Sequence, residues 1–193
     1  MKSIMISIQP QWVEKILNGE KTIEIRKTMP KCELPIKVYI YCTKGKYEQY
    51  TPPLSDTNYE YAFGYVMNGK VVAEFTLNKV ECFTTDYRRD KEQTNRISKD
   101  SCVRFEELEE YEYGKPCLYA WRIYNLKIYD TPKELSEFYS WKDCPYKDWG
   151  DIDNIGCWEC GCEMFSRGEC RFGHLQLERP PQSWCYVEEM KSE

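Results

Sequence analysis

The first 19 residues change from a short apolar run to a helical spacing of apolar positions. Residues 4–8 read Ile-Met-Ile-Ser-Ile, which is typical of a short strand. Pro10 then suits the first position of a helix. Trp12, Val13, Ile16 and Leu17 recur at helical spacing, and Asn18-Gly19 is a common helix stop. The pattern therefore predicts a strand, a short helix and a glycine turn.

Residues 19–26 continue with strict alternation of charged and apolar side chains. In a strand, the two isoleucines fall on one face and the polar residues on the other, namely Thr22, Glu24 and Arg26. Lys21 then stands at the mouth of the strand. One interpretation is a solvated surface strand, in which Glu24 and Arg26 form a same-face ion pair. The other is a set of charged side chains lining a cleft.

Further along the chain, strands outnumber helices and stay short. Alternating or apolar runs predict strands at 38–41, 71–77 and 117–129, with Asn125 as a bulge in the last. Residues 103–111 and 132–138 predict short helices. Residues 86–100 are highly charged and poor in apolar side chains. This order is typical of a mixed α+β fold built around a small barrel.

Charge limits the possible partners. The chain of 193 residues carries a formal net charge of −5 and has a pI near 5.2, which argues against a general nucleic-acid binder. Charge is uneven, however, because residues 13–47 are basic and residues 106–112 are strongly acidic. A small basic cleft on an acidic body suits one nucleotide better than a long duplex. Two merely solvated faces are the alternative.

The location of the protein follows from two absences in the sequence. No apolar run approaches the length of a membrane span, and the first strand is too short for the apolar region of a signal peptide. We therefore expect a cytoplasmic protein that does not enter a membrane.

Cysteine is abundant, and its late cluster predicts a metal site. The odd total of 11 cysteines and the missing signal argue against a disulfide framework. A C-x-x-C pair and a C-x-x-x-H pair can close a tetrahedron around zinc, and these pairs supply Cys157, Cys160, Cys170 and His174. Cys162 and Cys144 are alternative ligands. A redox pair or free thiols is the other interpretation. Four protein ligands would make the zinc structural.

The N-terminal unit resembles the ASCH domain of the PUA-like superfamily. The resemblance rests on the opening strand, the helix ending Ile-Leu-Asn-Gly at 16–19, and the G-x-K-T-x-E-x-R segment at 19–26. It continues more weakly at 71–77, 118–123, 126–129 and 179–187. The resemblance implies an α+β PUA-like β-barrel with short flanking helices, formed by residues 1–139 and 176–190. The cysteine-rich residues 140–175 would be a zinc-binding insert.

The resemblance also implies a cleft that binds RNA, a nucleotide or a nucleoside. Its ligand-binding residues would be Trp12, Lys21, Thr22, Glu24 and Arg26. A cleft lysine contributes little to packing, so the loss of Lys21 would cost little stability. The alternatives are purely structural roles, in which Lys21 closes a turn and Trp12 anchors its helix. For the whole protein, the alternative is a protein-interaction module.

Two enzymatic alternatives come from other branches of the family. One resembles an amidohydrolase that deacetylates N4-acetylcytidine with a lysine, a threonine and a glutamate. Lys21 and Glu74 match two of these positions, but Glu24 stands where the threonine falls, and a carboxylate is a poor nucleophile toward an amide. The other branch cleaves RNA. In either case Lys21, Glu24 and Glu74 would be the catalytic residues. Glu74 pairing with Arg26 inside the sheet is the structural alternative.

Overall fold

The computed structural model describes residues 2–44, 68–86, 90–141 and 174–189. The first half contains β1 (Ser3–Ile8), α1 (Pro10–Leu17), β2 (Ile23–Arg26), β3 (Ile36–Cys42) and β4 (Val71–Phe83). The second half contains α3 (Lys91–Ser101), α4 (Phe105–Glu112), β5 (Leu118–Lys133), a 3₁₀ turn (Leu135–Glu137), β6 (Phe138–Trp141), β7 (His174–Gln176) and β8 (Trp184–Glu189). The strands form one mixed sheet in the order β2-β5-β4-β3-β1-β8-β6-β7. The predicted α+β class is confirmed.

The N-terminal unit folds as its sequence pattern predicts. Pro10 begins α1, and Val13 and Ile16 are buried on its inner face. Gly19 adopts φ +77°, a conformation that glycine reaches without strain, and this turn leads the chain into β2. β1 and β3 are neighbouring parallel strands of the sheet. In the sequence, α1 and β2 belong to the connection between them.

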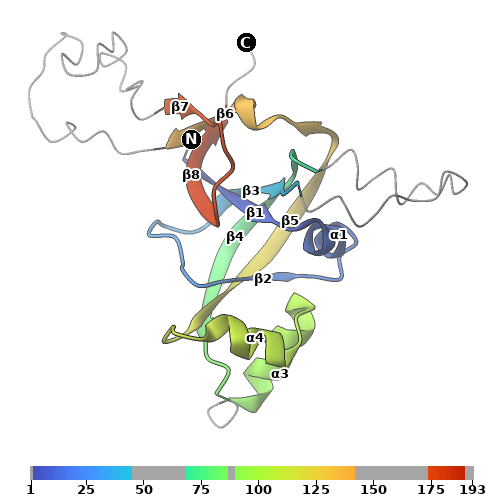
Figure 1. The fold of residues 1–193 in the computed structure, drawn as a ribbon, viewed down its shortest axis with the longest axis vertical. Coiled ribbons are helices and arrows are strands. Elements are labelled where there is room, and N and C mark those ends of the chain that lie inside the picture. Colours follow the sequence, from blue (N-terminus) through green and yellow to red (C-terminus); the bar gives the residue numbers. More distant parts are fainter. Residues whose placement is uncertain (1, 45–67, 87–89, 142–173, 190–193) are drawn as a thin grey trace, which may run out of the picture.

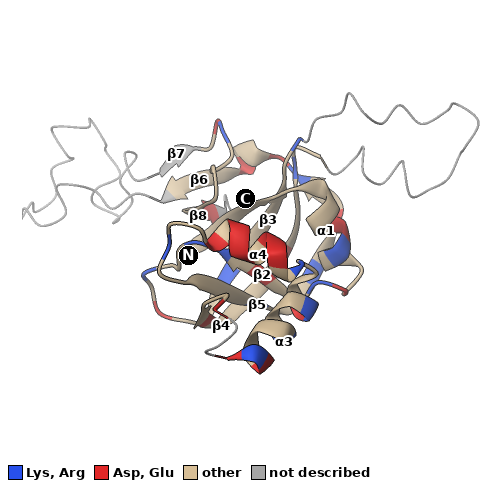
Figure 2. Cartoon of the chain, turned by 60° about the horizontal axis from the view of Figure 1, so that its bottom comes forward, with Lys and Arg blue, Asp and Glu red and all other residues tan. Residues whose placement is uncertain are grey.

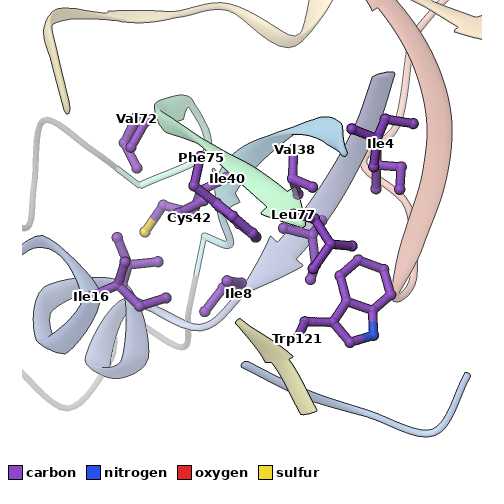
Figure 3. Packing of buried hydrophobic residues seen from close by; sticks show 14 residues of the cluster. Ile4, Ile8, Ile16, Val38, Ile40, Cys42, Val72, Phe75, Leu77 and Trp121 are labelled. Atoms are coloured by element: carbon purple, nitrogen blue, oxygen red, sulfur yellow. The ribbon is translucent and has the colours of Figure 1, made fainter. Parts of the chain in front are cut away.

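Three apolar clusters cover the faces of the sheet. The largest lies beneath α1, where side chains of β3 and β4 point toward Ile8 and Ile16 and where Trp121 of β5 closes one side (Figure 3). A second cluster on the opposite face includes Tyr39 and Phe138. The third joins β2 and the adjoining ends of β4 and β5 to the helices α3 and α4. These helices lie together at the β2 end of the molecule (Figure 1).

Two segments differ from the sequence prediction. Residues 86–100, which looked only charged, contain most of α3, because Asp90 accepts a hydrogen bond from Gln93 N as an N-cap and Ile97 is buried. Residues 132–138 do not form the expected helix. β5 continues to Lys133, which pairs with Val71, and only a 3₁₀ turn follows. The predicted helix at 103–111 is α4. Asn125 has φ 51° and lies at a register shift of β5 against β4, so the predicted bulge is present.

Most of the predicted cysteine-rich insert lies outside the described residues, together with Cys144, Cys157, Cys160, Cys162 and Cys170. Its two ends are described: β6 and β7 are antiparallel, and Trp141 pairs with His174. The two described ends of the insert are therefore neighbouring strands of the sheet. Within the described ranges, no group of three or more Cys, His, Asp or Glu residues is placed to hold a metal ion.

No helix in the described part of the chain combines the length and apolar character needed to cross a bilayer.

Candidate functional site

Lys21 lies at the centre of a buried charge cluster between β2 and α3. Its side chain is only 2% exposed, and its ammonium donates a 2.7 Å hydrogen bond to the Ser101 carbonyl at the end of α3. The Glu24 carboxylate lies 3.3 Å away. Burial lowers the pKa of Lys21, and the negative charge of Glu24 opposes this shift without cancelling it. Lys21 is thus held by two acceptors and is nearly inaccessible to water.

Glu24 joins Lys21 to Arg26. One of its oxygens faces Lys21, and the other lies 3.0 Å from an Arg26 guanidinium nitrogen. Both side chains are 10% exposed. Glu24 pairs directly with Trp121 on β5, so it lies on the sheet face of the largest apolar cluster. The alternation seen in the sequence therefore places the two charges side by side, but inside the protein rather than on a solvated face.

Arg26 ties this cluster to the first strand and to the segment before β8. Its Nη2 donates to the Ser7 carbonyl at 2.7 Å, and its Nη1 donates to Ser183 Oγ at 3.3 Å. Its buried Nε has no hydrogen-bond partner among the described residues. The same holds for the buried Nε1 of Trp121, whose ring packs against Trp184 at 5.7 Å between centroids. Two buried donors at this end of the sheet thus have no acceptor within the described part of the chain.

Two aromatic side chains, Trp12 and Tyr111, lie at the edge of the cluster, which we call its rim. Trp12 is half-buried on α1, with its ring centroid 5.3 Å from the Lys21 ammonium. Tyr111 on α4 is 38% exposed, and the Lys27 ammonium lies 4.6 Å from its ring centroid. Burial raises the pKa of Tyr111, and the charges of Arg26 and Glu24 act on it in opposite directions. Tyr111 therefore lies between the charge cluster and solvent.

Some residues of this site could not be recognised from the sequence. Ser7 and Ser101 contribute backbone carbonyls, which leave no signature in a sequence, and Ser183 contributes both its hydroxyl and its carbonyl. Tyr111 could have been suspected only as an aromatic in the acidic helix. Thr22, predicted as a ligand contact, has an exposed side chain at the entrance to β2.

Glu74 is not part of this cluster, and its predicted place beside Arg26 is wrong. It pairs with Tyr39 on β3 and therefore faces the second apolar cluster, on the opposite side of the sheet from Glu24. Tyr129 donates a 2.6 Å hydrogen bond to it, and Lys37 lies 3.2 Å away. Burial would raise the pKa of Glu74, but these two partners lower it. Glu74 therefore belongs to a separate local network with Tyr129 and Lys37.

The expectation that Lys21 contributes little to stability also fails. A lysine with two buried acceptors is part of the interior, so its removal leaves a carbonyl and a carboxylate without their donor. The rim residues Tyr111 and Lys27 can be changed with less effect on packing.

Comparison with known proteins identifies the fold. No protein-family model and no curated protein matches the sequence. Among solved structures, the chain is similar to ASCH from Zymomonas mobilis, with 15% sequence identity over 96% of this chain and 87% of that chain and a TM-score of 0.55. A serine-to-alanine mutant of that protein gives 14% identity, 96% and 88% coverage, and a TM-score of 0.55. The chain therefore has the ASCH fold that its N-terminal motif predicted.

Replacing Glu24 by Gln should destabilise the protein strongly. The change leaves two buried cations without their shared carboxylate, a loss on the order of 3 kcal/mol in the free energy of unfolding. Glu20→Gln is the matched control, because Glu20 pairs with Lys15 on the surface and should change stability by less than about 1 kcal/mol. Urea denaturation of both variants checks this. Equal effects would contradict the buried network.

The stability contribution of Lys21 should increase with pH. Because its pKa is lower in the native state than in the unfolded chain, the unfolded chain binds more protons between those two pKa values. The free energy of unfolding of the wild type, relative to Lys21→Met, should therefore rise as the pH approaches 10.5. Urea denaturation from pH 7 to 10 measures the difference and removes contributions that both proteins share. A constant or falling difference would contradict it.

Proposed function

We propose that this protein binds RNA or a nucleotide, with one nucleotide unit held at the charge cluster. The observation that carries this proposal is the surplus of positive charge in the interior. Lys21 and Arg26 share the single carboxylate of Glu24, and all three side chains are at least nine-tenths buried. A buried charge without a counter-ion is costly. A phosphate or another anionic group would supply the missing charge.

The unpaired donors support the same proposal. Buried N–H groups in proteins nearly always have acceptors, and Arg26 Nε and Trp121 Nε1 lack them within the described residues. Nucleotides carry acceptors of two kinds, phosphate oxygens and base carbonyl or ring nitrogen atoms. Arginine binds phosphate well because its planar guanidinium matches the oxygen spacing.

The rim suits a base rather than a long strand. Tyr111 offers an exposed ring next to Lys27, and aromatic rings stack bases with little sequence preference. The helix that carries Tyr111 is, however, dominated by acidic side chains (Figure 2). Such a helix repels a phosphate backbone that extends beyond the site. We therefore favour a single nucleotide, free or within a short RNA segment.

The enzymatic alternatives have less support. The amidohydrolase needs a lysine and a glutamate at one reaction centre, whereas Lys21 and Glu74 face opposite sides of the sheet. Its nucleophile is also missing, because Glu24 pairs with two cations and Thr22 points away to solvent.

Loss of the exposed ring at Tyr111 should weaken nucleotide binding. Tyr111→Leu removes base stacking of about 1–3 kcal/mol, so the dissociation constant for nucleoside monophosphates should rise by roughly 5- to 150-fold. Tyr113→Leu is the matched control, because Tyr113 is 88% exposed near the end of the same helix. Isothermal titration calorimetry with CMP, AMP and short 5′-phosphorylated RNA measures the affinities.

Three further outcomes separate the functions. Binding that weakens as salt rises and is lost with the unphosphorylated nucleoside supports phosphate recognition. Turnover of N4-acetylcytidine, or cleavage of the RNA, would select an enzyme instead. If no nucleotide or RNA binds at millimolar concentration, or if both leucine variants bind equally, the proposed site is wrong.

We also propose that the cysteine-rich insert binds one structural zinc ion through Cys157, Cys160, Cys170 and His174, with Cys162 and Cys144 as alternative ligands. Thiolate and imidazole are the preferred ligands of zinc. The backbone pairing of Trp141 with His174 is compatible with this proposal, because it brings the two ends of the insert together in the sheet.

Zinc should therefore copurify with the protein at about one ion per chain. Elemental analysis after purification without chelator measures it, and Cys157→Ser with Cys160→Ser should abolish it because half of the ligands are removed. Cys32→Ser, outside the cluster, is the control. A protein that lacks zinc and keeps its thermal stability in the presence of a chelator would contradict the proposal.

A further inference from the structure

Two cysteines lie where the chain leaves the sheet for the helices and where it returns. β4 ends at Phe83, which pairs with Leu118 at the start of β5, and Cys82 pairs with Tyr119. Phe83 and Leu118 both point into the cluster beneath α3 and α4. Because strand side chains alternate, Cys82 and the residue before Leu118, Cys117, point to the other face as diagonal neighbours.

The register of β4 and β5 brings the two cysteines to the same face, where hydrogen bonding with the Cys117 side chain acts on the Cys82 thiol. Cys82 is exposed and Cys117 is half-buried, so small reagents can reach the pair. The hydrogen bond with Cys117 raises the pKa of Cys82 to about 11, so that thiol keeps its proton at neutral pH. Both cysteines are free thiols in this structure.

We propose that Cys82 and Cys117 are a reversible oxidation site that closes into a disulfide with hydrogen peroxide. One thiol loses its proton and its sulfur attacks a peroxide oxygen; the O–O bond breaks, and a sulfenic acid and, with that proton, water result. The second thiol then loses its proton, its sulfur attacks the sulfenic acid sulfur, the S–O bond breaks, and the hydroxide leaves with that proton as a second water. Two thiols and one peroxide thus give one disulfide and two waters. A dithiol reductant reverses the reaction.

The disulfide would fasten both ends of the helical segment. Everything from Cys82 to Cys117, including α3 and α4, would become a closed loop. The reduced protein holds α3 to the sheet mainly by side-chain contacts, such as the 2.6 Å ion pair of Arg96 with Glu81. α3 also presents the Ser101 carbonyl to Lys21, and α4 presents Tyr111. Oxidation would therefore restrict opening of the helices that cover the charge cluster, whatever ligand that cluster binds.

The test is peptide mapping of the full chain after oxidation. The protein is treated with stoichiometric hydrogen peroxide at pH 8.5, blocked with an alkylating reagent and digested without reduction. Mass spectrometry should find the Cys82 and Cys117 peptides linked, with two hydrogens fewer than their sum. The link should be absent in Cys82→Ser and in Cys117→Ser and present in the control Cys32→Ser. If both cysteines are recovered alkylated, or each is linked to another cysteine, the proposal is wrong.

Hydrogen exchange tests the consequence. Amides of α3 and α4 should exchange about tenfold more slowly in the oxidised wild type than in the reduced protein, because a cross-link restricts local opening. Peroxide should leave exchange in the two serine variants unchanged. If the disulfide forms but the amides of α3 and α4 exchange at an unchanged rate, the disulfide does not restrict the opening of these helices.

Discussion

The burial of two cations around one carboxylate is the constraint on which this end of the molecule depends. Charges withdrawn from water are tolerated only when they are closely paired and their remaining hydrogens find acceptors. Lys21 obtains its acceptor from the end of α3, and Arg26 obtains acceptors from β1 and from the segment before β8. An edge strand of four residues is thereby bonded to the helices and to both ends of the described chain. Loss of any one partner leaves an unpaired charge in an apolar interior.

The same constraint gives the site its chemical character. The interior retains one more positive charge than negative, and two of its donors lack acceptors within the described residues. Around it stand an exposed tyrosine and a lysine, while the acidic face of α4 lies next to them. This arrangement is the basis of our proposal that the site binds a small anion with a flat aromatic part rather than an extended polyanion. The helices that form the rim join the sheet next to Cys82 and Cys117, so their attachment to the sheet and the shape of the site are linked.

The sequence predicted the local geometry of the site but not its burial. Pro10, Gly19 and the alternation at 19–26 each act over a few residues, and they correctly placed Glu24 and Arg26 on one strand face. The acceptor of Lys21 comes from a carbonyl 80 positions away, which no local pattern reveals. Glu74 was misplaced for a related reason, because register shifts along β4 decide which face it joins. α3 was missed because it buries few apolar side chains, chiefly Ile97.

The most direct test of the site uses the two buried donors that lack partners. In ¹⁵N-edited NMR spectra, the Trp121 Nε1–H signal, assigned with Trp121→Phe, and the Arg26 Nε–H signal, assigned with Arg26→Lys, can each be followed while CMP is added. Both signals should be visible without ligand, because buried hydrogens exchange slowly with water. Both should then shift in a saturable manner as acceptors arrive. If CMP binds while neither signal moves, or if both hydrogens exchange rapidly with water, the charge cluster is not the nucleotide site.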